Sequence, residues 1–301
     1  MNSKLFAVIV SFRPNESLIE LIDILGRHSI FVLVIANEDH GISRRILSSV
    51  PAGFSGEVMF NAKNMGIAYA LNQALRYGIK NQFNKMITFD QDSLPLECYF
   101  DEIKHHEQFG EAHRNVAVVS PTLIKFDGSE IRTDSYFGSS DTGYFFVTTT
   151  VTSGSIFDLQ ALSSVGGFTD DFFIDYVDHD VCLKLRKFGY LAARSTNARL
   201  KHQIGTHRTI KVFGKNFSLT EYSPHRHYFI ARNRILTYRR YIMFFPAWIL
   251  RDAAISTVWT ILTMTLEANR VEKVCNFALG LYHGVRGVTG NPGSFFVNAH
   301  E

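Results

Sequence analysis

The first 120 residues alternate between short apolar runs and segments whose apolar residues recur every three or four positions. The apolar runs predict buried parallel strands at residues 5–12, 31–36, 57–60, 85–89 and 116–120. The segments between them predict helices that begin near residue 17 and cover residues 43–50, 66–79 and 96–109. Four successive strand–helix units predict a doubly wound, mainly parallel α/β sheet, which binds ligands beyond the carboxyl ends of its strands.

Beyond residue 120 the pattern changes. A hairpin turn is predicted at Asp127-Gly128, and strands are predicted at residues 144–152, 190–193 and 198–202. Helices are expected around residues 158–164 and through Arg186, and the last third of the chain is predicted to be helical. We therefore expect a first domain over residues 1–240. A helical segment over residues 241–301 would then associate with a membrane or with a partner subunit.

One apolar stripe supports this expectation for the C-terminal segment. It consists of residues that recur at three- and four-residue steps: Trp248, Ile255, Trp259, Leu262 and Leu266. The longest uncharged run, residues 253–266, is too short to span a bilayer. The stripe fits a helix that lies in the membrane interface, and it fits core packing or a homodimer contact equally well.

Composition and charge limit the classes of protein to which this chain can belong. A chain of 301 residues that is 46% hydrophobic and 20% charged is globular, with room for one α/β domain and an appendage. Three scattered cysteines and the lack of a signal peptide predict a cytoplasmic protein. The net charge of +3 conceals eleven Lys and Arg between Arg199 and Arg251, against Glu221 alone. Such a basic stretch attracts phosphate groups, although a merely solvated face is the plainer alternative.

Two carboxylates follow the apolar strand at residues 85–89. Asp90 and Asp92 are one residue apart, so both side chains of an extended segment would point to the same side. Buried carboxylates at this separation repel each other unless a cation lies between them, and they suit hard divalent ions such as Mg²⁺ or Mn²⁺. Solvated acids in a turn would give the same short pattern.

A second acidic group precedes a predicted helix. Asp175, Asp178 and Asp180 lie within six residues and are flanked by aromatic side chains. N-capping of the helix accounts for one or two of them, and we select Asp178 as a candidate general base. His202 ends a later strand and is a candidate third ligand for Mn²⁺, with a structural role as the alternative.

Taken together, these segments resemble the family 2 inverting glycosyltransferases, which have the GT-A (Rossmann-like) fold. The resemblance covers residues 4–240 and rests on five segments in the family's order. They are the strand closed by Arg13-Pro14-Asn15, the run from Asn61 through Asn64, Gly66 and Ala70 to Asn72, the motif Phe89-Asp90-Gln91-Asp92-Ser93, the stretch from Thr152-Ser153-Gly154 to Phe173, and Asp178 followed by His202 and Arg232-Asn233-Arg234. Residues 173–178 are most similar to bacterial rhamnosyltransferases that use dTDP-L-rhamnose.

The resemblance implies a role for each matching residue. Asp178 would be the catalytic base, and Asp92 and His202 would bind Mg²⁺ or Mn²⁺. Contacts to the nucleotide sugar would come from Phe12, Arg13, Asn37, Asn64, Gly66, Asn72, Asp90, Gln91 and Asp92. Gly154, Asp175 and Arg232 would lie on the acceptor side. Two positions depart from the family pattern, because Ala36-Asn37 stands where Asp-Asn is usual and Val177-Asp178 where Glu-Asp is usual.

The expected reaction is the inverting transfer of a sugar to a lipid-linked or oligosaccharide acceptor. The expected donor is dTDP-L-rhamnose, which supplies L-rhamnose. The product would belong to O-antigen or cell-wall polysaccharide synthesis. The protein would lie peripherally at the inner face of the cell membrane. A sugar nucleotidyltransferase and a non-catalytic nucleotide- or glycan-binding module are the alternatives. The first normally has a glycine-rich loop after strand one, which Ser11–Asn15 is not, and the second has no use for Asp178. Nucleic acid would explain the basic stretch but neither acid site, and is not expected as a partner.

Overall fold

A computed structural model describes residues 4–38, 41–50, 54–131, 136–139, 143–202, 206–212, 215–266 and 269–291. The chain divides into two compact units. The first contains Met1–Asp170 and Val177–His202, and the second contains Asp171–Tyr176 and Gln203–Glu301. The sequence-based division at residue 240 falls inside the second unit, next to the end of a helix at Tyr241.

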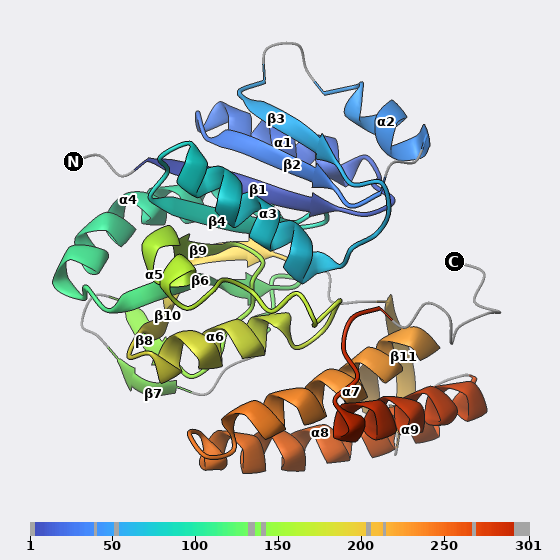
Figure 1. Cartoon of the computed structure of the whole chain (residues 1–301). Helices are drawn as coiled ribbons and strands as arrows, with labels where there is room; N and C mark the ends of the chain where they lie inside the picture. Colours follow the sequence, from blue (N-terminus) through green and yellow to red (C-terminus); the bar gives the residue numbers. More distant parts are fainter. Residues whose placement is uncertain are drawn as a thin grey trace. The chain divides into compact units, whose positions relative to one another are not determined.

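A mixed sheet forms the centre of the first unit (Figure 1). Its strand order is β3-β2-β1-β4-β9-β6-β10-β8-β7, with β5 paired to β10. The strands are β1 (Leu5–Ser11), β2 (Phe31–Ala36), β3 (Gly56–Phe60), β4 (Lys85–Asp90), β5 (Leu94–Pro95), β6 (Val116–Ile124), β7 (Tyr136–Ser139), β8 (Tyr144–Val147), β9 (Ser155–Asp158) and β10 (Leu191–Lys201). The pairs β1–β2, β1–β4, β2–β3 and β6–β10 are parallel, which confirms the predicted α/β class.

The apolar strands are buried because helices cover both faces of the sheet. The helices are α1 (Ser17–Arg27), α2 (Gly41–Leu47), α3 (Ile67–Lys80), α4 (Glu97–Ala112), α5 (Leu159–Ser164) and α6 (Val177–Lys187). Helix α1 packs with Ala7 and Ile9 of β1, whereas α3 approaches Phe6 on the opposite face. At Gly78 of α3 an added Cβ would lie 2.7 Å from the Phe6 ring, so this close contact requires glycine.

Two strand predictions beyond residue 120 are wrong in their extents. The segment predicted as one strand over residues 144–152 ends as β8 at Val147, and the chain then forms the unpredicted strand β9, which runs antiparallel to β4 and β6. The two short strands predicted at residues 190–193 and 198–202 are one strand, β10. Its pairing with β6 shifts register between Arg194 and Arg199, and this irregularity produces the break in the apolar pattern.

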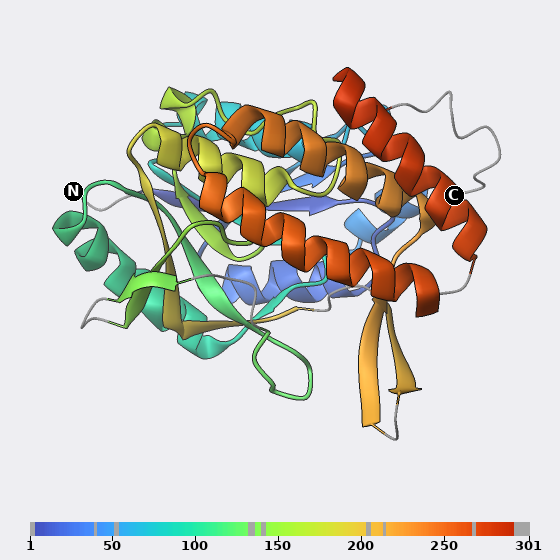
Figure 2. The ribbon, with the colours of Figure 1, turned by 90° about the horizontal axis from the view of Figure 1, so that it is seen from below.

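The described residues of the second unit form a hairpin and three helices, drawn in orange and red in Figure 2. The hairpin joins β11 (Thr206–Val212) to β12 (Lys215–Glu221), and it is a correction to the predicted helical last third. The helices are α7 (Pro224–Tyr241), α8 (Pro246–Leu266) and α9 (Arg270–Arg286). Helix α9 approaches α7 closely at Gly280, where a Cβ would lie 2.3 Å from the carbonyl oxygen of Tyr228.

Among the described helices, none has the length and hydrophobicity needed to cross a bilayer. Part of the predicted apolar stripe is exposed, with Ile255 and Trp259 both about half accessible to solvent. The side chains of Leu262 and Leu266 lie outside the described part of the chain. The predicted stripe is therefore solvent-facing at these two positions, and what covers it stays a prediction.

Candidate functional site

The candidate site lies where β4 ends. Strand β4 ends at Asp90, and the turn Gln91-Asp92-Ser93 leads into β5. Strand β5 pairs antiparallel with the end of β10, so that Leu94 is opposite Lys201. Because His202 follows Lys201 directly, this register places the histidine beside the turn. Pairing between segments more than 100 residues apart therefore creates the cluster.

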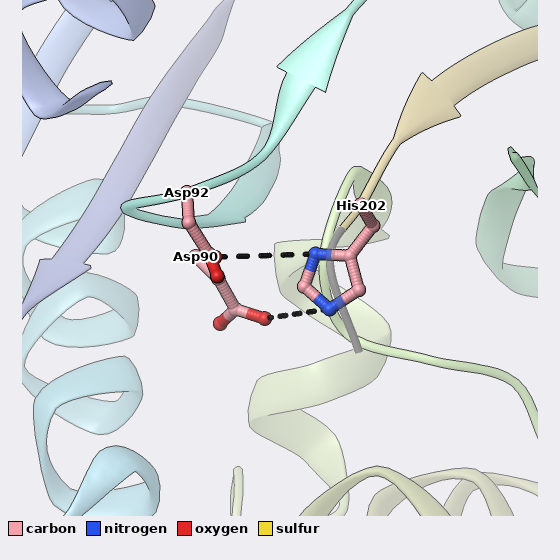
Figure 3. A group of neighbouring side chains, drawn as sticks. All are labelled: Asp90, Asp92 and His202. Carbon is pink, nitrogen blue, oxygen red and sulfur yellow. Dashed lines mark ion pairs between the residues drawn. The ribbon is translucent and has the colours of Figure 1, made fainter. Parts of the chain in front are cut away.

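The side chains of Asp90, Asp92 and His202 face one another (Figure 3). Asp90 Oδ2 is 3.9 Å from His202 Nε2, and Asp92 Oδ1 is 4.0 Å from His202 Nδ1. One ligand atom from each residue lies within 4.8 Å of the others. The aspartate side chains are 35% and 45% exposed and the histidine 16%, so the cluster opens to solvent on the carboxylate side.

These three residues fit a divalent cation by donor type and by spacing. Two carboxylate oxygens and one imidazole nitrogen suit Mn²⁺, and they are an acceptable partial ligand set for Mg²⁺. Ligands in adjacent octahedral positions around an ion at about 2.1 Å would be about 3 Å apart. With one ligand atom taken from each residue, the separations lie within 4.8 Å, up to about 1.8 Å more than this value, and rotation of the exposed aspartate side chains would have to close the difference.

The turn between the two aspartates is attached to the end of β1 through Gln91. Ser11 Oγ and the Phe12 amide both donate to Gln91 Oε1 at 3.0 Å, and Gln91 Nε2 donates to the Phe12 carbonyl at 3.1 Å. The next residue, Arg13, has a left-handed backbone (φ 47°), and its amide donates to Glu38 Oε1. The structure thus attaches Gln91 to Phe12, and Arg13 follows directly; the contact of these three residues with a nucleotide sugar stays a prediction.

A group of asparagines lies at the end of β2. Asn37 is buried, and its Nδ2 donates to Asn64 Oδ1 at 2.9 Å. Its Oδ1 accepts hydrogen bonds from Asn61 Nδ2 and from the Met65 amide. Asn64 Oδ1 also accepts from the amide of Gly66, whose φ of 88° begins α3. Asn37, Asn64 and Gly66 therefore form one connected group, and their contact with a nucleotide stays a prediction.

Asn72 and Gly154 are enclosed by contacts within the first unit. Asn72 Nδ2 donates to the Phe168 carbonyl at 2.8 Å and to Asp170 Oδ1 at 2.6 Å, and its Oδ1 accepts from the Phe168 amide. Gly154 adopts φ 73°, and its carbonyl accepts from the Tyr99 hydroxyl. A Cβ at Gly154 would lie 2.8 Å from side-chain atoms of Pro121. The roles of both residues toward substrate stay predictions.

Asp178 and Asp180 have different environments, although both lie in the first turn of α6. Asp180 is fully buried, accepts a hydrogen bond from Thr169 Oγ1 at 2.6 Å and lies 3.9 Å from Lys184 Nζ. Asp178 is only partly buried, and its Oδ1 accepts from the amide of His179. Asp180 thus serves the fold, which leaves Asp178 the more accessible acid; its catalytic role stays a prediction.

Asp175 and Arg232, predicted on the acceptor side, both belong to the second unit. Arg226 donates to Asp175 Oδ1 at 2.6 Å. Arg232 is completely buried and donates to Asn233 Oδ1 and to the carbonyls of Asp171 and Gly290. Loss of hydration on burial lowers the pKa of this arginine. Their contact with an acceptor stays a prediction.

Sequence reasoning missed two serines next to the cluster. Ser93 Oγ lies 3.1 Å from His202 Nδ1 and 2.6 Å from Ser153 Oγ, and Ser153 Oγ accepts from the Asp90 amide at 3.2 Å. Both serines are buried. Ser93 is the last residue of the segment Phe89–Ser93 and Ser153 precedes Gly154, so their position within these two segments was the available signal.

No family model matches the chain. A curated relative, dTDP-rhamnosyl transferase RfbF of Shigella flexneri, is 27% identical over 310 residues, covering 96% of this chain and 98% of that protein. Its similarity confirms the resemblance to rhamnosyltransferases that the motifs predicted.

Solved structures share the fold at low sequence identity. A mannosyltransferase from Pyrobaculum calidifontis, solved with GDP-Man and Mn²⁺, has a TM-score of 0.55 and 13% identity over 95% of this chain and 88% of its own. S. aureus TarS 1–349, solved with UDP-GlcNAc, has a TM-score of 0.56 and 12% identity over 95% of this chain and 81% of its own. GalNAc-T7, solved with UDP, GalNAc and Mn²⁺, has a TM-score of 0.53 and 10% identity, and the match covers 66% of this chain and 43% of that one.

The solved structures bear on the fold of this chain, and the curated relative bears on its class of protein. The structural matches establish the fold, and the relative, matched over nearly its whole length, supports a glycosyltransferase. The fold of this chain is the GT-A fold of the glycosyltransferases, with a helical C-terminal region.

Proposed function

We propose that this protein is an inverting rhamnosyltransferase that moves L-rhamnose from dTDP-L-rhamnose to a saccharide acceptor in O-antigen or cell-wall polysaccharide synthesis. The observation that carries the proposal is the cluster of Asp90, Asp92 and His202 at the end of β4. The name of the curated relative supports the donor. Parallel strands of α/β sheets end where ligands bind, and this cluster has the donor atoms that a nucleotide-diphosphate site needs.

In this proposal each residue of the cluster has one task. Asp92 and His202 would hold Mg²⁺ or Mn²⁺, and Asp90 would accept a hydrogen bond from the ribose. A divalent cation supplies positive charge that stabilises a departing diphosphate. Gln91 keeps the turn on the end of β1 through its three hydrogen bonds with Ser11 and Phe12, so the aspartates are positioned before substrate binds.

Asp178 would act as general base in a single displacement. The acceptor oxygen forms a bond to the anomeric carbon while the bond from that carbon to the diphosphate oxygen breaks. The proton of the acceptor hydroxyl passes to the Asp178 carboxylate, which is worth on the order of 10²–10⁴ in rate. Its partial exposure supports this task, because an acceptor must reach it, whereas the fully buried Asp180 is already engaged by Thr169.

A donor panel with two variants tests this reaction. Wild type, Asp178→Asn and Asp180→Asn are incubated with Mn²⁺, a lipid-linked saccharide and one of dTDP-rhamnose, UDP-GlcNAc or GDP-mannose, and released nucleoside diphosphate is measured. We expect turnover with dTDP-rhamnose, and a 10²–10⁴-fold loss of kcat in Asp178→Asn with donor binding retained. Asp180→Asn should instead lower thermal stability.

Each result discriminates among the functions. Full transfer by Asp178→Asn would refute the base assignment. Transfer from another sugar nucleotide alone would refute rhamnose. Release of pyrophosphate from dTTP and a sugar phosphate would identify a nucleotidyltransferase, and donor binding without turnover would identify a binding module.

The lipid-linked acceptor and a peripheral membrane location are the second part of the proposal. Exposed apolar side chains gather on the helices of the second unit and on the turn between α7 and α8, with Leu250, Val258, Trp259, Ile261 and Val271 on the helices and Met243 on the turn. The exposed charged side chains described on these helices are Arg239, Arg251, Arg270 and Arg286, against Glu272. Apolar side chains beside an excess of arginine suit the surface of an anionic bilayer at the cytoplasmic face.

Flotation with liposomes tests the membrane contact. Wild type should float with vesicles that contain phosphatidylglycerol and only weakly with pure phosphatidylcholine. The double variant Val258→Ser/Ile261→Ser should lose most of this binding, whereas Phe126→Ser, which changes an exposed apolar residue of the first unit, should not. Equal flotation of all three proteins would refute the contact. A concentration-dependent dimer that Val258→Ser/Ile261→Ser dissociates would instead assign this surface to a second copy.

A further inference from the structure

A short segment of the second unit leads directly into the helix that carries Asp178. Asp171–Tyr176 belongs to the second unit, and the next residue, Val177, begins α6 of the first unit. Asp178 lies in the first turn of α6. The conformation of this segment therefore determines where α6 begins, and the link between the two is the peptide bond itself.

The last two residues of the segment do not continue a right-handed helix. Asp175 and Tyr176 have φ of 62° and 63°. An L-residue adopts this left-handed backbone at a cost in free energy, so it persists where surrounding contacts hold it. Asp175 Oδ1 accepts from Arg226 at 2.6 Å, and the Tyr176 hydroxyl donates to Asp252 Oδ2 at 2.8 Å. Side chains of α7 and α8 thus anchor both residues.

Asn233 of α7 bonds to the backbone of the same segment. It is completely buried, and its Nδ2 donates to the carbonyls of Ile174 and Asp175 at 2.7 and 2.9 Å. In an α-helix the amide of residue i bonds to the carbonyl of residue i−4. These two carbonyls are therefore the acceptors that the amides of Asp178 and His179 would use if α6 extended by one turn toward the N-terminus. Asn233 holds both carbonyls in bonds to α7 instead.

The amide of His179 bonds to the carboxylate of the proposed base. Amides in the first turn of a helix have no carbonyl partner within the helix, so they bond to other groups. Here the His179 amide donates to Asp178 Oδ1 at 2.8 Å. A local bond of this kind restricts the rotation of the carboxylate. The start of α6 at Val177 therefore fixes the Asp178 side chain as well as its backbone.

We propose that Asn233 is a positioning residue for the general-base step. By bonding to two carbonyls of the preceding segment it fixes the start of α6, and the His179 amide then holds Asp178 through Oδ1 while Oδ2 takes the proton of the acceptor hydroxyl. The second unit thereby serves the reaction itself, in addition to the proposed membrane contact. This inference rests on the proposed function, because it concerns Asp178 as the base.

The isosteric variant Asn233→Asp gives the first test. It keeps an oxygen for the hydrogen bond from Arg232 Nε but removes both donors to the segment. We expect kcat to fall by about 10–100-fold, as for a catalytic group held about 1 Å out of place, with the dissociation constant of dTDP-rhamnose within about two-fold of wild type. Released nucleoside diphosphate gives kcat, and isothermal titration calorimetry gives donor affinity.

Thr237→Val is the matched control on the same helix. Thr237 is completely buried, and its Oγ1 donates to the Asn233 carbonyl at 2.8 Å. The variant removes a buried polar group from α7 but leaves Nδ2 of Asn233 on the segment, so kcat should stay at the wild-type value. Wild-type kcat in Asn233→Asp, or an equal loss of kcat in Thr237→Val, would overturn the proposal.

A double-mutant cycle tests whether Asn233 acts through the base. In the Asp178→Asn background, Asn233→Asp should lower the residual kcat by less than about two-fold, because residues that act through one group are not additive. A loss as large as that in the wild-type background would show that Asn233 acts on something other than Asp178, and would refute its role as a positioning residue for the base.

Two substitutions at Asp175 test the backbone conformation separately. Asp175→Gly and Asp175→Ala both remove the carboxylate that Arg226 binds. Glycine adopts a φ near 62° without strain and alanine does not, so kcat should be about 5–10-fold lower in Asp175→Ala than in Asp175→Gly. Equal kcat values in the two variants would overturn the proposal, and a raised acceptor KM in both would then assign the Asp175 carboxylate to the acceptor.

The His179 amide gives a readout that is independent of activity. Its signal is observed in protein labelled with nitrogen-15 histidine and is assigned with His179→Gln. Asp178→Ala removes the hydrogen-bond acceptor of this amide, so its proton signal should move upfield. The signal should move in the same direction in Asn233→Asp and stay in place in Thr237→Val. An unchanged signal in Asn233→Asp would contradict the proposal.

The proposed base and its positioning fail in different ways. Full transfer by Asp178→Asn would show that the base itself is wrong. If Asp178→Asn loses turnover while Asn233→Asp keeps it, the base stands and the role of Asn233 is wrong. Thermal unfolding shows whether each variant is folded, and the Asp175 pair decides the question if Asn233→Asp does not fold.

Discussion

The two units of this protein each contain a group of charged and polar side chains, but the two groups are bonded differently. In the first unit, Asp90, Asp92 and His202 face one another at 3.9–4.0 Å, beyond hydrogen-bond distance, and the aspartates are more than a third exposed. In the second unit, Arg232 and Asn233 are completely buried, and each makes several hydrogen bonds within 3.2 Å.

The partners of Asn233 and Arg232 explain why they are bonded so fully. Asn233 Nδ2 donates to the carbonyls of Ile174 and Asp175 at 2.7 and 2.9 Å. Asp175 and Tyr176 both have a left-handed backbone, with φ of 62° and 63°, which costs non-glycine residues about 1 kcal/mol or more each. Buried donors from α7 thus hold a short segment in a conformation that it would not adopt alone.

This comparison distinguishes side chains that can bind a ligand from side chains that stabilise the fold. Ligand atoms that face one another without hydrogen bonds between them retain capacity for a cation, whereas buried atoms whose bonds are all made within the protein stabilise the fold. Charge alone would not have distinguished the two groups, since both contain ionisable residues close together. The comparison predicts that variants of the first group lose ligand binding and that variants of the second lose stability.

The largest effect is expected for Asp92→Ala. Loss of a ligand oxygen from the cluster should reduce sugar transfer by about 10²–10³-fold and abolish measurable Mn²⁺ binding. The free energy of unfolding should change by less than about 0.5 kcal/mol, because the side chain is 45% exposed and makes no close ion pair with His202, 4.0 Å away. Asp101→Ala, which removes an exposed carboxylate on α4, is the control and should alter neither quantity. A large loss of stability in Asp92→Ala would contradict the distinction.

Arg232→Met should have the opposite profile. It removes the donors for Asn233 Oδ1 and for the carbonyls of Asp171 and Gly290, so the unfolding free energy of the second unit should fall by about 3 kcal/mol. Both tryptophans, Trp248 and Trp259, lie in α8, so fluorescence during denaturant titration reports on this unit.

A matched substitution on the same helix completes this test. Arg240 is about one-third exposed and approaches Asp171 Oδ2 at 3.5 Å, so Arg240→Met should cost less than about 1 kcal/mol. Mn²⁺ affinity should be unchanged in both variants. If Arg232→Met proves as stable as Arg240→Met, the buried group does not support the fold.

The smallest effect concerns pH. His283 Nδ1 lies 2.9 Å from the Tyr228 hydroxyl, and burial, with a further contribution from the Arg232 charge, lowers the pKa of His283. The unfolded chain therefore binds this proton at higher pH than the folded protein does. Stability should fall as pH decreases below about 6.5 toward the lowered pKa, by an amount that His283→Gln removes. His105→Gln, at an exposed position, should leave this pH dependence intact, as judged by tryptophan fluorescence.

The local sequence determined those helices and strands whose hydrophobic pattern repeats within a single segment of the chain. The strands and helices of the first 120 residues follow from the periodicity of hydrophobic residues, and Asp90 and Asp92 follow directly on an apolar strand. Both signals depend only on residues that are neighbours in the sequence. Tertiary structure decided what depends on distant pairing. Strand β9 entered the sheet antiparallel between β4 and β6, and the pairing of β5 with β10 brought His202 to the aspartates.

The supporting side chains show the same division. The type of residue at Ser93, Ser153, Asn72 and Arg232 is visible in the sequence, but each has its partners up to about a hundred residues away. Short polar side chains such as serine and asparagine bond to whatever group the fold places beside them, so their partners leave no periodic signal. Physical chemistry of the local chain therefore specified the elements and the candidate ligands, and only long-range packing decided which polar groups remain open to a ligand and which are bonded within the protein.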